Sequence, residues 1–281
     1  VEPALGELAQ RIAGAADFLR RRITGDYTVD EFGFDPQYNE AVVMPVLRFF
    51  HDTWFRVEVS GVENIPDTGA ALIVANHAGT LPFDGAMLSV AVHDHHPRRR
   101  DVRLLAADML FDMPVVGPMA RKAGHTLACN VDANRLLAAG ELTGVFPEGF
   151  KGIGKNFRDR YKLQRFGRGG FVSAALRTKA PIIPCSIVGS EEIYPMLADM
   201  KLLARVLGMP YFPITPLFPL AGPVGHPDRH RAGVAHHGVA HHHLAALGRG
   251  RRQLERGRSG RTTRLDVGMA RPNGALQGRA G

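Results

Sequence analysis

A histidine and an aspartate follow an apolar run in the stretch ALIVANHAGTLPFDGAML, residues 71–88. The run 71–76 is rich in branched apolar residues and predicts a buried strand that delivers His77 into a turn. The next apolar segment begins near Asp84 and predicts a helix that carries this carboxylate back towards the histidine. A neutral imidazole oriented by a carboxylate is a general base, because the carboxylate fixes the tautomer and stabilises the imidazolium. We therefore expect His77 and Asp84 to form a base and its orienting partner.

Six residues separate His77 from Asp84. Pro82 is suited to begin the helix and Thr80 to cap it, which places Asp84 in the first helical turn, where it can reach back to the histidine. The alternative is a purely structural histidine, which is the commoner role of a lone histidine at a strand end.

Two further stretches carry residues of chemical interest. GVFPEGFKGIGK, residues 144–155, predicts a strand that runs into a Gly-rich loop with two lysines, and KAPIIPCSIVGSEEIYP, residues 179–195, predicts a strand that ends near Gly189. His77, Glu148 and Gly189 thus all follow predicted strand ends. Because the carboxyl ends of parallel strands meet at one edge of a sheet, we expect the site to lie at that edge.

Predicted strands and helices alternate along the middle of the chain, which is typical of an α/β fold with a mostly parallel central sheet flanked by helices. At 281 residues and 45% hydrophobic residues, the chain can bury one large core or two small ones. We expect strands over 55–61, 71–76, 102–106, 125–129, 143–147 and 180–189, and helices over 107–122, 131–140, 169–178 and 196–207.

The start of the chain predicts an N-terminal amphipathic helical pair. In residues 3–23 apolar side chains recur at helical spacing and a basic run closes the segment, while residues 38–54 carry a broad apolar face. Two interpretations are open for the first helix: docking on its own domain, or contact with an anionic bilayer surface. We assign residues 1–54 to a membrane-associating region and residues 55–225 to the α/β domain. The end of the latter, 190–225, is apolar and Pro-rich and either faces a membrane or acyl chain or packs on the surface.

The two cysteines, Cys129 and Cys185, both stand in apolar runs, which indicates buried thiols in a reducing compartment rather than a disulfide. No apolar stretch approaches the ~20 residues that span a bilayer, and no signal peptide is recognisable. We therefore expect a cytoplasmic protein, either free or lying on a membrane surface.

The net charge of +8 arises in residues 226–281, where 11 Arg stand against three acidic residues, so the body of the chain is neutral. This tail lacks Phe, Tyr, Trp, Ile and Lys and is rich in Arg, His, Gly and Ala, so we expect it to be disordered. Three readings are open: a basic arm for nucleic acid or anionic lipid, a His-rich metal tract, and an out-of-frame translation of GC-rich DNA. We favour the third, and expect no nucleic-acid partner.

In their order and spacing, NHAGTLPFD, FPEGFKGIGK and the Pro-containing strand resemble the glycerolipid acyltransferase superfamily, which includes the 1-acylglycerol-3-phosphate (lysophosphatidic acid) acyltransferases. The resemblance covers about residues 38–222 and rests on three ordered motifs, which makes it more specific than a single motif. The sequences DEFGFDP and FPEGFKGIGK resemble those of an uncharacterised bacterial branch of this superfamily.

The resemblance implies transfer of a fatty acyl group from acyl-CoA or acyl carrier protein to a hydroxyl of a glycerolipid or lysophospholipid. An alcohol is too weakly acidic to attack a thioester at neutral pH without a base, which is the role implied for His77, with Asp84 orienting its ring. No cofactor beyond the acyl donor and no metal is implied. The substrate-binding residues implied are Asn76, Gly79, Thr80, Phe146, Pro147, Glu148, Gly149, Lys151 and Lys155, with Lys151 facing an acceptor phosphate or carboxylate.

The resemblance also implies a peripheral protein on the inner face of the cell membrane, active in phospholipid biosynthesis, whose partners are the membrane surface, acyl-CoA and a lipid acceptor. The sequence departs from the family pattern twice. The family has four residues between the histidine and the aspartate, and it offers an Arg for the glycerol phosphate where Asn130 stands here, with Arg135 a turn later. The alternative function is a catalytically inactive, lipid-binding remnant of the family.

Two polar clusters have open interpretations. One combines metal-ligand side chains at a helix end that we expect to be exposed and solvated: His93, Asp94, His95 and His96. The other is a set of loop cations that either hold a nucleotide phosphate of CoA or face water: Lys155, Arg158, Arg160, Lys162 and Arg165.

Overall fold

A seven-stranded sheet forms the centre of the computed structural model, which describes residues 2–167, 169–216 and 264–267. The strand order is β1-β9-β6-β2-β5-β3-β4, and every neighbouring pair is parallel except β6 with β9. The mostly parallel α/β fold predicted from the sequence is confirmed. The strands are β1 Glu58–Ser60, β2 Ala71–Ala75, β3 Arg103–Ala106, β4 Thr126–Leu127, β5 Leu142–Val145, β6 Ile182–Val188 and β9 Arg264–Val267.

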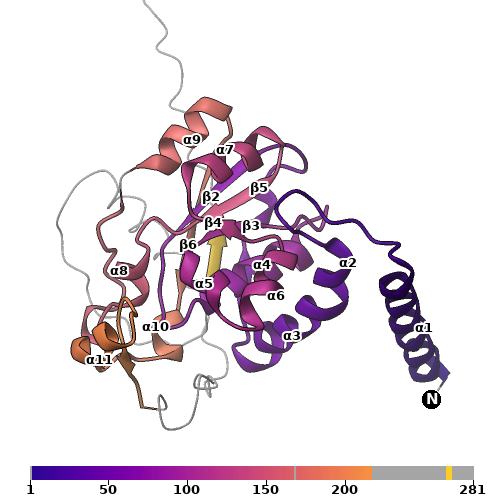
Figure 1. Ribbon diagram of the computed structural model, residues 1–281, viewed down its shortest axis with the longest axis horizontal. Coiled ribbons are helices and arrows are strands. Elements are labelled where there is room, and N and C mark those ends of the chain that lie inside the picture. Colours follow the sequence, from indigo (N-terminus) through magenta and orange to yellow (C-terminus); the bar gives the residue numbers. More distant parts are fainter. Residues whose placement is uncertain (1, 168, 217–263, 268–281) are drawn as a thin grey trace, which may run out of the picture.

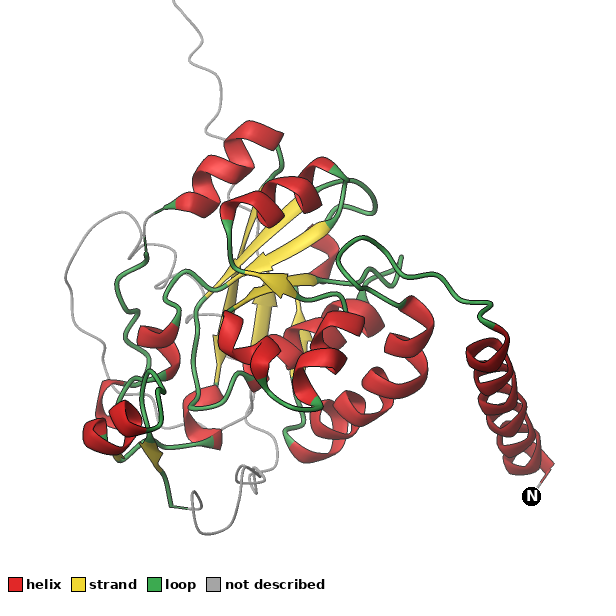
Figure 2. Ribbon diagram, in the orientation of Figure 1, coloured by secondary structure: helices red, strands yellow, loops and turns green. Residues whose placement is uncertain are grey.

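Helices cover both faces of this sheet, as Figure 2 shows. Successive side chains of the central strand β2 point to opposite faces. Ile73 and its odd-numbered neighbours pack with α4 (Phe83–His95), whereas Leu72 packs with α7 (Asn130–Ala138) and α9 (Gly170–Thr178). Because β2 is buried from both sides, the end of the strand is a rigid support for the residues that follow it.

The predicted N-terminal helical pair is present. The helix α1 spans Glu2–Thr24, and a continuous helical segment composed of α2, η1, α3 and η2 runs from Pro36 to Trp54, with π-type turns in η1 (Asn39–Val43) and η2 (Phe49–Trp54). Figure 1 shows α1 standing beside the body and approaching it only near its C-terminal end, where Arg22 forms an ion pair with Asp35. Within the described residues, no helix combines the length and the apolarity needed to cross a membrane.

After β6 the chain forms α10 (Ser190–Ile193) and then a short hairpin. Its strands β7 (Ala198–Asp199) and β8 (Pro213–Ile214) pair antiparallel, and α11 (Lys201–Val206) lies between them. The hairpin lies beside α8 (Phe150–Ile153), the helix that follows β5 (Figure 1). The loop after β5, predicted to be irregular, also contains η4 (Phe157–Asp159).

Three local predictions are wrong. The helix expected over 107–122 is broken into α5 (Asp108–Asp112) and α6 (Val116–Lys122), because Pro114 precedes Val115, whose backbone has a φ of +66°. The helix expected over 196–207 is reduced to α11. Cys129 is exposed, although Cys185 is buried as expected.

The tail 226–281 contributes the strand β9, which pairs with β1 and β6 in the main sheet. The prediction of disorder did not include this strand. The remainder of the tail lies outside the described residues, as do its histidine clusters and most of its arginines.

Candidate active site

The two residues predicted to act as base and partner are in contact. His77 follows the end of β2, and its Nδ1 lies 2.6 Å from Oδ2 of Asp84. The Asp84 side chain is completely buried, while that of His77 keeps 12% of its surface exposed. Since Nδ1 is committed to the carboxylate, Nε2 on the opposite side of the ring is the nitrogen that can exchange a proton with a substrate.

Asp84 is held in place by the backbone around it. Oδ2 also accepts from the Ala78 N–H at 2.9 Å, and Oδ1 accepts from the Gly85 N–H at 2.8 Å. Asp84 lies in the first turn of α4, as expected, where the helix dipole favours a negative charge. The six-residue spacing therefore closes to a hydrogen bond, and the carboxylate has little freedom to leave it.

Thr80 does not cap α4, contrary to the prediction. The residue at the N-cap position is Pro82, and it makes no side-chain cap. The Thr80 hydroxyl is buried and donates instead to the Tyr194 carbonyl at 3.0 Å, while the Thr80 carbonyl accepts from the Tyr211 hydroxyl at 2.6 Å. The turn between β2 and α4 is thus tied on both sides to the chain that follows β6.

Neither tyrosine was singled out from the sequence, because both lie far along the chain from the motif that they contact. Tyr211 is half-buried near the histidine–aspartate pair: loss of solvent around the hydroxyl, followed by the negative charge of Asp84, raises its pKa well above the usual range. Its hydroxyl therefore stays protonated and remains a donor. The only sequence signal for this contact was the aromatic, Pro-rich composition of the region around it.

Glu148 supports the backbone of the histidine. The residue is buried, and its Oε1 accepts from the His77 N–H at 2.9 Å while Oε2 accepts from the Gln164 N–H at 2.5 Å. Both carboxylate oxygens thus accept from backbone N–H groups, and the substrate-binding role that the resemblance implies stays a prediction. Glu148 thus connects the end of β2 to the Gly-rich loop through hydrogen bonds to both segments.

Two neighbours pack closely against His77, one on its ring and one on its backbone and Cβ. The Phe146 ring stacks on the His77 ring with 4.5 Å between centroids. Gly152 lies against the backbone of His77 so closely that an added Cβ would stand 2.5 Å from the His77 carbonyl oxygen and 2.7 Å from its Cβ. Only glycine therefore fits at this position of α8.

Asn76 locks the strand that carries the histidine. Its Nδ2 donates to the Ile187 carbonyl at 2.8 Å, and its Oδ1 accepts from the Ile187 N–H at 2.7 Å. Both ends of the amide thus hold the backbone of β6, and the substrate-binding role that the resemblance implies for Asn76 stays a prediction. Gly79 is equally constrained, because it has a φ of +85° and an added Cβ would stand 2.8 Å from the Ser190 carbonyl oxygen.

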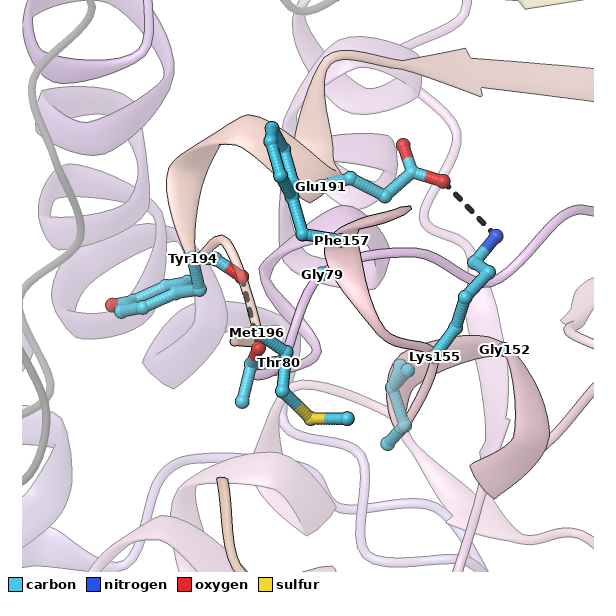
Figure 3. A pocket seen from close by; sticks show the side chains of 9 residues that line it. Gly79, Thr80, Gly152, Lys155, Phe157, Glu191, Tyr194 and Met196 are labelled. Atoms are coloured by element: carbon cyan, nitrogen blue, oxygen red, sulfur yellow. Dashed lines mark hydrogen bonds and ion pairs between the residues drawn. The ribbon is translucent and has the colours of Figure 1, made fainter. Parts of the chain in front are cut away.

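Lys155 is placed differently from the expectation of a loop cation available to substrate. Its side chain is 4% exposed and forms an ion pair with Glu191 of α10, with 3.0 Å between Nζ and Oε1 (Figure 3). The same Glu191 oxygen accepts from the Tyr161 N–H at 3.2 Å. The pair lines a small hollow beside the turn between β2 and α4, together with Gly79, Thr80, Gly152, Ile153, Phe157, Tyr194 and Met196.

The remaining predicted binding residues surround this arrangement. Pro147 accepts through its carbonyl from the Gly167 N–H at 2.9 Å, and Gly149 precedes α8 with a φ of +54°. Lys151 is exposed on α8. The other loop cations, Arg158, Arg160, Lys162 and Arg165, are all exposed.

Two residues stand near the place where the family pattern offers an arginine for the glycerol phosphate. Asn130 is exposed at the start of α7, and Arg135 forms an ion pair with Glu31 at 2.5 Å while lying over the Phe32 ring. The segment that connects the N-terminal helices thus contacts Arg135, whose side chain remains about half exposed at 49%.

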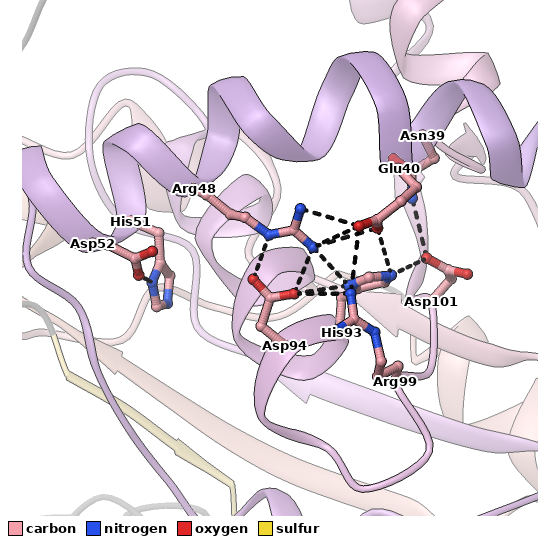
Figure 4. A network of polar contacts seen from close by, with 9 residues as sticks. All are labelled: Asn39, Glu40, Arg48, His51, Asp52, His93, Asp94, Arg99 and Asp101. Atoms are coloured by element: carbon pink, nitrogen blue, oxygen red, sulfur yellow. Dashed lines mark hydrogen bonds and ion pairs between the residues drawn. The ribbon is translucent and has the colours of Figure 1, made fainter. Parts of the chain in front are cut away.

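The His93 cluster is not at an exposed helix end, contrary to the prediction. His93 and His96 are buried, and His93 faces Asp94, Glu40 and Asp101 (Figure 4). Arg48 binds Asp94 and Glu40 from the preceding helical segment. Within the described residues, no group of three or more His, Cys, Asp or Glu side chains could hold a metal ion.

Comparison with known proteins finds a family model that matches part of the chain. Residues 56–188 match the model of the Acyltransferase family. An uncharacterised protein of Mycobacterium tuberculosis (strain ATCC 25618 / H37Rv) is 76% identical over 224 residues, which cover 80% of this chain and 63% of that protein. An uncharacterised protein of Mycobacterium leprae (strain TN) is 74% identical, with coverage of 80% and 61%. The chain thus spans less than two thirds of the length of these relatives.

More distant similarities are also found. A human protein described as a DGAT1/2-independent enzyme synthesizing storage lipids is 25% identical over 165 residues, which cover 59% of this chain and 50% of that protein. The crystal structure of the 1-acyl-sn-glycerophosphate acyltransferase PlsC from Thermotoga maritima aligns with a TM-score of 0.44 at 25% identity, covering 56% of this chain and 61% of that chain.

The matched range 56–188 contains His77, Asp84 and Glu148 and ends with β6, so it includes the residues whose geometry is described above. This part of the chain, residues 56–188, is thus an Acyltransferase family domain.

Proposed function

We propose that this chain is an O-acyltransferase that moves a fatty acyl group from a thioester donor to a hydroxyl of a glycerolipid or lysophospholipid, with His77 as general base. The observation that carries the proposal is the 2.6 Å contact between Nδ1 of His77 and a fully buried Asp84. The donor is acyl-CoA or acyl carrier protein. The lipid acceptor is supported by the human relative, which is described as synthesizing storage lipids.

The proposed reaction needs no enzyme nucleophile. Nε2 of His77 accepts the hydroxyl proton as the acceptor oxygen attacks the thioester carbonyl carbon. Asp84 stabilises the resulting imidazolium through Nδ1. The tetrahedral intermediate then expels the thiolate by breaking the C–S bond, and the imidazolium returns its proton to the sulfur. An ester and a free thiol are the products.

We further propose that acceptor recognition involves Lys151, because it is exposed on the helix that packs against the His77 backbone. A lysine there attracts a phosphate or carboxylate of the acceptor. Arg135 is assigned no such role, since it is paired with Glu31. The reaction requires no metal or resident cofactor, and it takes place at the inner face of the cell membrane as part of phospholipid biosynthesis.

The proposal is tested by free-thiol release from acyl-CoA and from acyl carrier protein across a panel of lysophospholipids and monoacylglycerols. His77→Ala is expected to lower kcat by about 10³-fold, the usual size of a general-base contribution. His95→Ala is a matched control, because His95 is exposed on the same α4 helix and takes no part in the site. Lipid binding without thiol release by the wild-type chain contradicts the proposal and favours an inactive lipid-binding remnant.

A further inference from the structure

The hairpin after β6 presents an unusual density of apolar side chains to solvent. In α11, Leu202 and Val206 are 74% and 75% exposed. The apolar side chains exposed along the whole segment are Leu197, Met200, Leu202, Val206, Leu207 and Met209. This run, residues 197–209, is referred to below as the exposed hairpin segment.

The orientation of α11 explains which side chains are exposed. Ala204 is buried and forms the side of the helix that packs on the protein. A helix turns by about 100° per residue, so Leu202 and Val206 point roughly 160° away from Ala204. Their exposure therefore follows from how the helix is docked, and both point straight out from the body.

Two cations lie beside this apolar pair. Lys201 and Arg205 are one turn apart on a flank of α11 and are both exposed. The one acidic residue of the segment, Asp199, is half-buried and its Oδ1 accepts from the Phe212 N–H at 3.0 Å, and from 200 to 210 the sequence contains no acidic residue. Apolar side chains next to cations on α11 match the boundary between the headgroups and acyl chains of an anionic bilayer. A second copy of this surface would instead oppose its own cations.

The exposed hairpin segment is directly connected to the candidate active site. Just before it, Met196 lines the hollow next to the turn between β2 and α4, and its carbonyl accepts from the Phe157 N–H at 2.8 Å. Just after it, Tyr211 donates to the Thr80 carbonyl. A surface that held this segment would therefore lie close to the turn that carries His77.

We propose that the exposed hairpin segment docks the chain on an anionic lipid bilayer, with Leu202 and Val206 entering the headgroup boundary and Lys201 and Arg205 contacting lipid phosphates. The inference rests on the proposed function, which it deepens by naming the surface that meets the membrane. It assigns docking to the segment next to the site rather than to α1 alone.

The test is co-sedimentation of the full chain with vesicles of phosphatidylglycerol and phosphatidylcholine, and with vesicles of phosphatidylcholine alone. The double change Leu202→Asp and Val206→Asp is expected to lower the partition coefficient at least about tenfold, because two apolar insertions are lost. Leu176→Asp is the matched control: Leu176 is also 74% exposed, but it lies on α9, which covers the opposite end of the fold. It is expected to leave binding unchanged.

A second variant tests the charge. Lys201→Ala with Arg205→Ala is expected to weaken binding to the anionic vesicles about tenfold and to leave binding to phosphatidylcholine unchanged. Both positions are exposed and alanine favours helix, so this variant retains the fold, which circular dichroism checks. If both double variants bind vesicles as tightly as the wild type does, the inference is overturned. Membrane contact would then be made by α1 or through a protein partner.

The vesicle-binding experiment can be distinguished from the test of acyl transfer. His77→Ala is expected to bind vesicles like the wild type, because His77 lies away from the exposed hairpin segment in sequence and is only slightly exposed. Hairpin-dependent binding without thiol release sustains docking and contradicts acyl transfer. Thiol release together with vesicle binding that does not depend on the exposed hairpin segment sustains acyl transfer and contradicts docking through this segment.

Discussion

The helix α4 has a histidine–aspartate pair at each end, and the two pairs are built differently. At its start, His77 gives one ring nitrogen to Asp84, which is fully buried and held by backbone N–H groups. At its end, Nδ1 of His93 faces Asp94 at 2.9 Å, while its Nε2 faces Glu40 at 3.4 Å and Asp101 at 3.8 Å.

The difference fits the proposed role of His77 as a general base and a structural role for His93. At His77 a single carboxylate binds one ring nitrogen and leaves the second for a substrate. At His93 carboxylates face both ring nitrogens, and Arg48 forms ion pairs with the carboxylates of Glu40 and Asp94. The second arrangement joins the segment Pro36–Trp54 to α4. Residue type and proximity are thus shared by the two pairs, and the number of partners decides what each can do.

The largest expected difference between the pairs concerns their aspartates. Asp84→Asn is expected to lower kcat/KM by about 10²- to 10⁴-fold, because an amide cannot stabilise the imidazolium and favours the wrong tautomer. The equivalent change Asp94→Asn is expected to alter it by less than about twofold. Thiol-release kinetics on folded proteins measure both, and equal losses would remove the distinction.

The position of the His77 ring gives the next effect. Gly152→Ala introduces a Cβ that would collide with the His77 carbonyl oxygen, so the backbone must shift and displace the imidazole. We expect kcat to fall by about 10²-fold. Gly14→Ala serves as the control for a change of glycine to alanine, since no atom lies within 4 Å of its added Cβ and Gly14 lies within the helix α1. Full activity of the Gly152 variant would show that the ring tolerates displacement.

The structural role of the second pair is tested through Arg48. Arg48→Met removes the ion pairs at 2.7 Å to Asp94 and 3.2 Å to Glu40. We expect the free energy of unfolding to fall by about 1–2 kcal/mol, as is usual for partly buried charged hydrogen bonds, with kcat unchanged. Urea unfolding monitored by circular dichroism measures the loss. A selective loss of activity would instead connect this network to catalysis.

The smallest effect is a pH dependence of the same network. The hydrogen bond from Arg48 is the main cause that holds the pKa of the Asp94 carboxyl well below its usual range. A lowered folded-state pKa gives stability that is complete above the unfolded value of about 4 and is lost as the pH falls below it.

The stability advantage of the wild type over Asp94→Asn is therefore expected to be constant near neutral pH and to shrink below about pH 4. Urea midpoints between about pH 3 and pH 7 measure it. Burial raises the pKa of Asp101, which has the opposite sign, but this residue is present in both proteins. An advantage that grows in acid would contradict the assignment.

Local sequence patterns predicted the strands and helices that depend only on neighbouring residues. The branched run before His77 predicted β2, and the apolar segment after Pro82 predicted the helix that returns Asp84. The alternation of such patterns also predicted the parallel sheet. Each of these inferences needs only periodicity and strand or helix direction, which a short window contains.

The failures concern partners that come from elsewhere in the chain. Lys155 was expected to be available to substrate, and no local feature indicated that Glu191 would neutralise it. His93 was expected to be exposed, but Arg48 and Glu40 from an earlier helical segment enclose it. Burial of a charged or polar side chain depends on such distant contacts, which charge patterning along the chain does not encode.

The hydrogen bond from Tyr211 to Thr80 has a consequence for the order of synthesis. The two residues are 131 positions apart, so every strand from β2 to β6 emerges from the ribosome before the tyrosine does. At bacterial and eukaryotic translation speeds this interval is on the order of 10 s. A nascent chain thus contains all three sequence motifs while the turn bearing the histidine still lacks one of its tethers, and this tether forms only after Tyr211 has been synthesised.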